Sequence, residues 1–209
     1  MLRAMDAPAN ITYRAELARK GIHLCSLAIP VCAWFVPKWF AVAILVAMAL
    51  GSFAVDYFRG RDGAFANFLN AHFSFMLRPH EREVAGGRIV MTGSTWMLLS
   101  AVITFAIFAK PVAVAAFAML IVCDTAAALV GRRWGRIRFG RKRKSLEGSA
   151  AFFIAGVLVA AVTPEVPLWI GAVASLVAAV VEAVFWRVDD NFSIPLSAGA
   201  VMTALLALT

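Results

Sequence analysis

The residues best suited to chemistry lie in one stretch of the chain, residues 124–149. It begins with Asp124 inside an apolar segment and continues into a loop that carries eight of the chain's 20 Lys and Arg residues. It ends at four polar or small residues, Lys144, Ser145, Glu147 and Gly148. The start of a helix favours an anion, and neighbouring cations attract a polyanion such as a nucleoside triphosphate. The stretch therefore predicts a site that handles phosphate groups.

Further acidic residues lie near the ends of later apolar segments. A charged residue at the centre of a membrane helix costs about 2.5–3.5 kcal/mol to insert, so Asp124 should face other helices and be functional. Glu182 has an alternative explanation, an ion pair with Arg187. Asx capping would explain one residue of Asp189-Asp190-Asn191, but not all three. Because Mg²⁺ takes oxygen ligands and phosphate oxygens, the candidate metal ligands are Asp124, Asp190 and Glu182.

The composition places these residues in a membrane. Hydrophobic residues make up 62% of the 209 and charged residues 15%, and the mean hydropathy is +0.83, which is typical of an integral membrane protein. The apolar runs cover 22–36, 39–57, 95–109, 111–130, 149–163, 167–186 and 194–208. They predict an all-α, polytopic transmembrane helix bundle of about seven spans, forming a single integral membrane domain over residues 1–209. The net charge of +8 comes with no basic stripe carrying interleaved aromatic residues outside the spans, so nucleic-acid binding is disfavoured.

The cations also predict the orientation of the bundle. With these spans, 18 of the 20 Lys and Arg residues fall on one side, and only Lys38 and Lys110 fall on the other. The positive-inside rule then puts the N-terminus and the phosphate site in the cytoplasm.

The first span and the long connection after the second carry further patterns. Glu16, Arg19, Lys20 and His23 share one helical face, which a snorkelling anchor with an ion pair four residues apart would also explain. In the connection 58–94, five apolar residues recur at helical spacing, namely Phe65, Phe68, Leu69, Phe73 and Met76. They predict a helix that lies in the membrane interface or packs on the bundle. The hydroxyls of Thr92, Ser94 and Thr95 are partly explained as helix caps.

Several short motifs occur in a fixed order along the chain. They are Arg19-Lys20-x-x-His23-Leu24, Arg78-x-His80-Glu81, Thr92-Gly93-x-Thr95, Asp124-x-Ala126-Ala127 with Gly131-Arg132-x-x-Gly135, Lys144-Ser145-x-Glu147-Gly148, and Asp189-Asp190-Asn191. Together they resemble the membrane-bound CTP-dependent polyprenol kinase family, which includes dolichol kinase, phytol kinase and CTP-dependent diacylglycerol kinase. The central portion is also similar to phosphatidate cytidylyltransferase, whose closing Asp-Arg-x-x-x-Asp-Ser signature this chain lacks. A non-enzymatic lipid or ion transporter that uses the buried acids is a further alternative.

The resemblance implies phosphoryl transfer from CTP, with Mg²⁺ as cofactor, to a lipid alcohol such as an isoprenoid alcohol or diacylglycerol. Asp124 and Asp190 would bind Mg²⁺. The nucleotide would be bound by Arg132, Gly135, Lys144, Ser145, Gly148 and Asn191. Glu147, His23 and Glu81 are candidates to orient the acceptor hydroxyl. The smaller bacterial or phytol-type members are the nearer match, and a bacterial inner membrane is expected. Formation of a homo-oligomer is left open.

Overall fold

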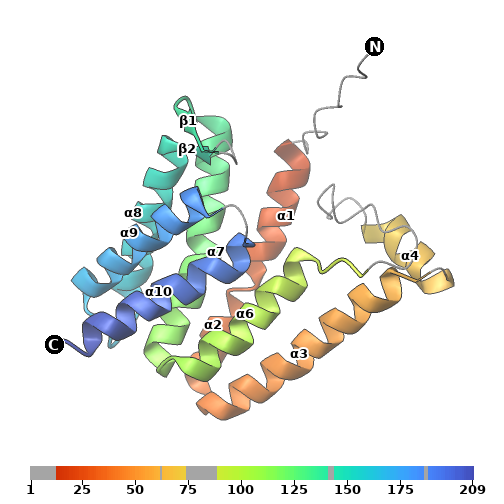
Figure 1. The fold of residues 1–209 in the computed structure, drawn as a ribbon, viewed down its shortest axis with the longest axis horizontal. Coiled ribbons are helices and arrows are strands. Elements are labelled where there is room, and N and C mark those ends of the chain that lie inside the picture. Colours follow the sequence, from red (N-terminus) through yellow and green to blue (C-terminus); the bar gives the residue numbers. More distant parts are fainter. Residues whose placement is uncertain (1–12, 62, 74–88, 141–143, 186–187) are drawn as a thin grey trace.

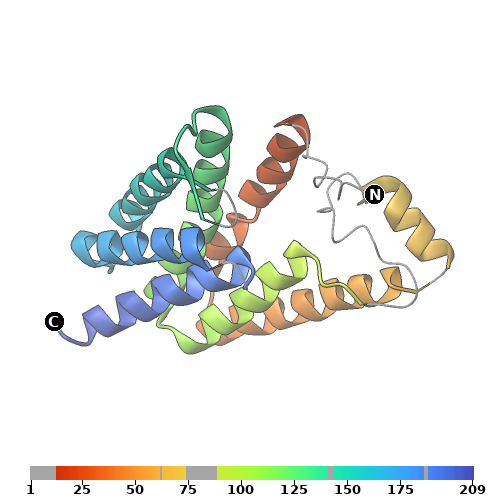
Figure 2. The same ribbon diagram turned by 45° about the horizontal axis from the view of Figure 1, so that its top comes forward.

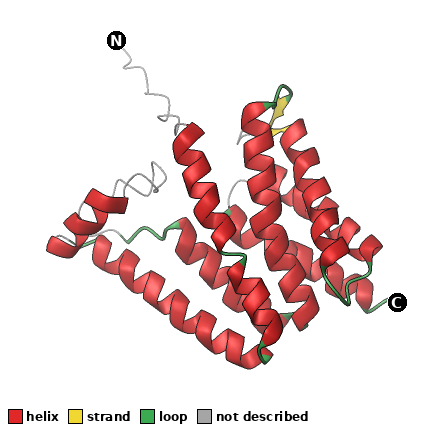
Figure 3. Cartoon of the chain, turned by 180° about the vertical axis from the view of Figure 1, so that it is seen from behind, coloured by secondary structure: helices red, strands yellow, loops and turns green. Residues whose placement is uncertain are grey.

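The computed structural model describes residues 13–61, 63–73, 89–140, 144–185 and 188–209. Within these residues the chain is helical apart from its loops and one short hairpin (Figures 1 and 3). In chain order the elements are α1 (Tyr13–Cys25), α2 (Ala28–Phe35), α3 (Lys38–Arg59), α4 (Ala64–Phe73), α6 (Gly93–Ile107), α7 (Lys110–Arg133), β1 (Arg138–Phe139), β2 (Lys144–Ser145), α8 (Leu146–Val162), α9 (Leu168–Val184) and α10 (Asp190–Leu206). The all-α class expected from the composition is therefore confirmed.

Helix α7 is the centre of the bundle and carries Asp124. It contacts α1, α2, α6, α8 and α10. Ala115, Phe117, Leu120 and Ile121 are fully buried along it, and small residues let the neighbouring helices approach closely. In contrast, α3 packs mainly on α6 and lies at the edge of the bundle (Figure 1). The apolar window of α3 is 17% buried, against 67% for α7.

The seven apolar runs that the sequence predicts as spans form helices of different lengths. Only α3 and α7, with 22 and 24 residues, are long and apolar enough to cross a membrane by length and composition among the described residues. At 1.5 Å per residue, the 17 residues each of α8, α9 and α10 span roughly 25 Å. The number of spans therefore stays a prediction.

The segment 22–36, expected as one span, is divided between α1 and α2. The break lies at Ser26–Leu27. Pro30 has no N–H to donate to the Ser26 carbonyl four residues earlier, and that carbonyl accepts from the Ile29 N–H instead, at 2.9 Å. The break separates α1, which contains Lys20 and His23, from the apolar α2.

The connection after α3 contains α4, as the spacing of its aromatic residues predicts. Phe65 and Phe68 are about half exposed, and α4 stands beside the C-terminal end of α3, apart from the rest of the bundle (Figure 2). Contact of this surface with lipid stays a prediction. Met76, Arg78, His80 and Glu81 lie outside the described residues.

Candidate active site

Asp124 on α7 lies opposite the polar face of α1. The ammonium group of Lys20 donates to Asp124 Oδ2, and His23 Nε2 lies 3.6 Å from the same oxygen. Lys20 is 2% exposed. The sequence predicts that Lys20 and His23 share one helical face, and in the structure this face contacts Asp124. The side chain of Glu16, the alternative ion-pair partner of Lys20, lies outside the described residues.

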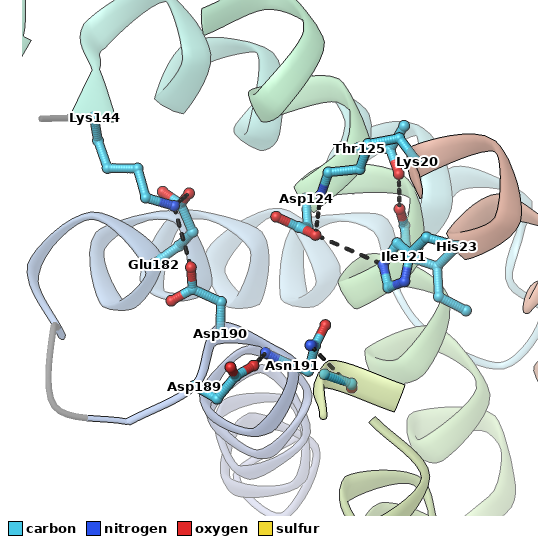
Figure 4. A network of polar contacts seen from close by, with 11 residues as sticks. Lys20, His23, Ile121, Asp124, Thr125, Lys144, Glu182, Asp189, Asp190 and Asn191 are labelled. Carbon is cyan, nitrogen blue, oxygen red and sulfur yellow. Dashed lines mark hydrogen bonds and ion pairs between the residues drawn. The ribbon is translucent and has the colours of Figure 1, made fainter. Parts of the chain in front are cut away.

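A second group of charges lies across from Asp124 and comes from β2, α9 and α10 (Figure 4). The ammonium group of Lys144 donates to Glu182 Oε1 and, at 3.2 Å, to Asp190 Oδ2. Burial alone would lower the pKa of Lys144, but the carboxylates of Asp190, Glu182 and Asp124 outweigh burial and raise it above its ordinary value. Figure 4 shows this group and the Asp124 group across from each other, so we describe them as the two halves of one candidate site.

This arrangement differs from the three-carboxylate metal site that the sequence suggests. Asp124 is paired with Lys20, while Glu182 and Asp190 share Lys144. Among the residues that the structure describes, no three acidic, His or Cys side chains form a group that could hold a metal ion. Figure 4 shows the second carboxylate oxygen of Asp124 pointing away from Lys20, toward the side of Glu182 and Asp190. The partner of Glu182 is Lys144; Arg187, the alternative, lies outside the described residues.

Ser145 and three glycines join the end of α7 to the start of α8. Ser145 caps α8, and its Oγ accepts from the Gly148 N–H at 3.0 Å. A Cβ on Gly135 would lie 2.2 Å from the Gly131 carbonyl oxygen and 2.6 Å from Ser145 Oγ. A Cβ on Gly148 would lie 2.9 Å from the Ala127 carbonyl oxygen. The expected anion contact from the Gly148 N–H is thus taken by the cap, and these glycines allow the close packing that holds Lys144 in place.

Glu147 has a clear role in the loop that precedes it. Its Oε1 accepts from the backbone N–H groups of Arg136 and Ile137, at 3.0 and 3.3 Å. Its own backbone N–H and these two hold the pKa of the Glu147 carboxyl below its ordinary value. An acid among eight cations is therefore explained by loop structure. Arg132 is exposed in the last turn of α7.

The three polar residues that open α10 have three different contacts. Asp189 is the N-cap, and its Oδ1 accepts from the Asn191 N–H at 2.9 Å. Asp190 faces Lys144, and the Asn191 side chain donates to the Gly93 carbonyl oxygen at 3.2 Å. Asx capping explains one of the three, as expected. Asn191 instead ties the start of α10 to the start of α6.

Several proteins similar to this chain are named as kinases of lipids or of phytol. The chain is 30% identical over 236 residues to "Probable phytol kinase, chloroplastic" of Triticum aestivum, covering all of this chain and 74% of that protein. It is 26% identical to "CTP-dependent diacylglycerol kinase 1" of Schizosaccharomyces pombe, covering 91% of this chain and 94% of that protein. The protein of that name from Saccharomyces cerevisiae is 30% identical over 54% of this chain and 48% of its own length. No family model and no solved structure matches the chain.

The chain belongs to the CTP-dependent polyprenol and lipid kinase family. The resemblance based on its short motifs is thereby confirmed. Three of the motifs meet in space in this family member. Lys20 and His23 of the first motif contact Asp124 of another, and Lys144 of a third lies across from Asp124 (Figure 4).

Two charged residues of this family member are not among the site residues that the sequence predicts. Lys20 fits a surface anchor, although its position three residues before His23 on one helical face was a usable signal. Asp56 was not singled out, yet it is 2% exposed and its Oδ2 accepts from the Thr92 N–H and from the hydroxyls of Thr92 and Thr95. Thr92 makes no side-chain capping bond in α6. The threonines bind Asp56 instead, and an acid in the last turns of an apolar span was the signal.

Proposed function

We propose that this protein is a CTP-dependent lipid kinase that transfers the terminal phosphoryl group of CTP to a lipid alcohol. The hydroxyl oxygen of the lipid bonds to the γ-phosphorus, the bond from that phosphorus to the β,γ-bridging oxygen breaks, and CDP leaves. The observation that carries the proposal is the ion pairing of the partly buried Lys144 with both Glu182 and Asp190, across from Asp124, in a chain of this family. The lipid is an isoprenoid alcohol or diacylglycerol.

Phosphoryl transfer depends mainly on positioning and on neutralising charge, and the site contains groups for both. Lys144 would contact the triphosphate. The carboxylates fit Mg²⁺, which needs one or two of them when phosphate oxygens and waters complete its ligands. Asp124 and Asp190 would hold the ion, with Glu182 nearby, and the bound ion would neutralise charge on the phosphates. Arg132, exposed at the loop, would add positive charge on the approach of the nucleotide.

His23 is the best placed of the candidates for taking the proton of the lipid hydroxyl. Its Nε2 is buried beside Asp124 and has no hydrogen-bond partner. Lys20 would position Asp124 by holding one of its two oxygens. Glu147 is bound to the loop backbone, and Glu81, outside the described residues, stays a candidate from the sequence alone.

The decisive experiment is an assay of purified protein in detergent with CTP, Mg²⁺ and a panel of lipid alcohols. We expect CDP and a phosphorylated lipid to appear together, and the preferred lipid identifies the substrate. Asp124→Asn serves as the inactive control. Release of pyrophosphate with phosphatidic acid would indicate a cytidylyltransferase instead, and the absence of turnover with every lipid would favour transport.

We further propose that the site faces the cytoplasm of a bacterial inner membrane, with the N-terminus on the same side. The cation distribution supports this orientation. A cysteine replacing exposed Arg136, in a variant without the three native cysteines, should resist an impermeant thiol reagent in intact cells and react after permeabilisation. Labelling in intact cells would reverse the orientation.

A further inference from the structure

A second buried polar cluster lies where the end of α3 meets the start of α6. Its residues are Ser52, Asp56, Arg59, Thr92 and Thr95. One oxygen of Asp56 accepts three hydrogen bonds from Thr92 and Thr95, at 2.6 to 3.1 Å. The Ser52 hydroxyl lies 2.7 Å from the Thr95 hydroxyl. The carboxylate of Asp56 is thus well satisfied by neutral donors.

Arg59 in the same cluster has fewer hydrogen-bond partners than its donors could use. The residue is 5% exposed, and its Nη2 donates to the Val90 carbonyl oxygen at 3.1 Å. Nη2 also lies 3.8 Å from Asp56 Oδ1, which makes an ion pair but is too long for a hydrogen bond. Nε and Nη1 are buried and have no hydrogen-bond partner among the described residues. A buried guanidinium therefore has two nitrogens available for an acceptor.

Such a group indicates a ligand because buried polar atoms in native proteins nearly always have a partner, and an unpaired one needs an explanation. A guanidinium is only a donor, and its planar N–H groups match the oxygens of phosphate or carboxylate. Asp56, the nearby carboxylate, already accepts three other bonds. A phosphate group, with several acceptor oxygens and negative charge, would fit the open donors of Arg59.

The position of the cluster connects it with the candidate active site. Thr92 binds Asp56, and the next residue, Gly93, accepts from Asn191 beside Asp190. Val90, among the residues that lead into α6, accepts from Arg59 in the last turn of α3, so the start of α6 lies against the C-terminal end of α3 (Figure 1). Phe58, the residue before Arg59, packs edge to face with Phe65 of α4, and both rings are about half exposed. A buried cation beside exposed aromatic residues suits a phosphate attached to an apolar chain.

We propose that Arg59 binds a phosphate group in this second cluster. The assignment of the source rests on the proposed function, because a lipid kinase offers two phosphate compounds, the phosphorylated lipid and the nucleotide. The apolar surroundings favour the phosphorylated lipid, which would leave the site of transfer by way of α6 and α3.

Binding can be measured without turnover, from the thermal stability of the purified full-length protein in detergent. The probes are inorganic phosphate, a soluble short-chain alkyl phosphate and CDP, each compared with chloride at equal ionic strength. We expect the alkyl phosphate to raise the Tm of the unmodified protein. The apparent Kd for the alkyl phosphate should rise at least tenfold in Arg59→Gln, and CDP binding should change less than threefold.

Arg61→Gln is the matched control, because exposed Arg61 lies two residues later and contacts the Tyr57 hydroxyl. It should bind the alkyl phosphate like the unmodified protein. Arg59→Lys keeps the charge but not the planar donors, so its affinity for the alkyl phosphate should be intermediate. It serves as the test variant if Arg59→Gln fails to fold. Equal affinity for every phosphate in Arg59→Lys and the unmodified protein, or no stabilisation of the unmodified protein, would overturn the proposal. A loss of CDP binding alone would assign the phosphate to the nucleotide. Each result is independent of whether CTP is turned over, so failure of the kinase assay is a separate outcome.

Discussion

The two halves of the candidate site use the same side-chain types in different proportions. On the α1 side, one lysine, Lys20, faces one carboxylate, Asp124. On the other side, one lysine, Lys144, faces two carboxylates, Glu182 and Asp190. The first pair is balanced in charge, whereas the second group keeps one excess negative charge when all three groups are ionised. The comparison suggests that Lys20 holds Asp124 in position, while the Lys144 group can accept a cation or exchange its lysine for a bound ligand.

The largest effect is expected at Asp124. Asp124→Asn removes the charge proposed to act on Mg²⁺, so activity should fall by orders of magnitude. It also leaves Lys20 buried without its ion-pair partner, so stability should fall by about 3–5 kcal/mol. From the sequence alone, this variant is expected to keep its stability; the partner found in the structure reverses that expectation. The measurements are CTP turnover and thermal unfolding in detergent.

A double variant separates the two roles of Asp124. Lys20→Met with Asp124→Asn removes both charges, so most of the lost stability should return while activity stays absent. A single Asp124→Asn variant as stable as the unmodified protein would show that Lys20 and Asp124 are not energetically coupled.

A smaller effect is expected at Lys144, whose side chain is 24% exposed. Lys144→Met leaves Glu182 and Asp190 facing each other, so stability should fall by about 2–3 kcal/mol, and nucleotide affinity should fall with it. Because the remaining pair of carboxylates suits a divalent cation, added Mg²⁺ should stabilise this variant more than the unmodified protein. Thermal unfolding in EDTA and in millimolar Mg²⁺ measures the difference.

The control for this charge change is Lys110→Met. Lys110 donates to the Val36 carbonyl oxygen at the other end of α7, far along the helix from the carboxylates. Its variant should show no added response to Mg²⁺. An equal response in the two variants would mean that the Lys144 group has no special affinity for the ion.

The packing that holds Lys144 can be tested at Gly135. A Cβ there would meet the backbone oxygen of Gly131 at 2.2 Å and Ser145 Cβ at 2.7 Å, so Gly135→Ala should cost about 1–3 kcal/mol through overpacking. Gly51→Ala is the matched control, because no atom lies within 4 Å of its added Cβ. The control should be neutral or more stable by up to about 1 kcal/mol. The free energy of unfolding of both variants is measured by denaturation. Equal stability of the two variants would contradict the close approach of Gly135 to Gly131 and Ser145.

The smallest effect concerns pH and Glu147. Its folded-state pKa lies below the ordinary value of 4.5 because three backbone N–H groups face the carboxylate. Its contribution to stability is therefore complete above pH 4.5 and is lost as pH falls through the lowered pKa. The stability of Glu147→Gln should depend less on pH over this acidic range than that of the unmodified protein. If the Tm of the two proteins falls with pH in parallel, the bonds to Arg136 and Ile137 contribute no significant stability.

The raised pKa of Lys144 has the opposite consequence. Its contribution to stability is complete below the ordinary value of 10.5 and is lost as pH rises through the raised folded-state value. Glu147 and Lys144 therefore differ in which extreme of pH weakens their contribution to stability, and neither contribution should change near neutrality.

Much of this molecule follows from local properties of the sequence. Long apolar runs can satisfy their backbone groups in a membrane only as helices or closed barrels, so hydropathy predicts α3, α6 to α10 and their approximate ends. Helical periodicity places Lys20 and His23 on one face, and Ser145 and Asp189 are caps because their oxygens lie close to the following N–H groups. These features depend on residues a few positions apart.

The pairing of charges was decided only by the tertiary structure. Lys20 and Asp124 are 104 residues apart, and Lys144 and Glu182 are 38 apart. Glu182 has a plausible partner close by in the sequence, Arg187, whereas Asp124 has none, and helical spacing does not tell which distant lysine will face either acid. The same holds for Asp56, whose donors belong to α6. In a low-dielectric bundle a buried charge takes the partner that helix packing brings to it, and that packing is set by the shapes of all the helices together.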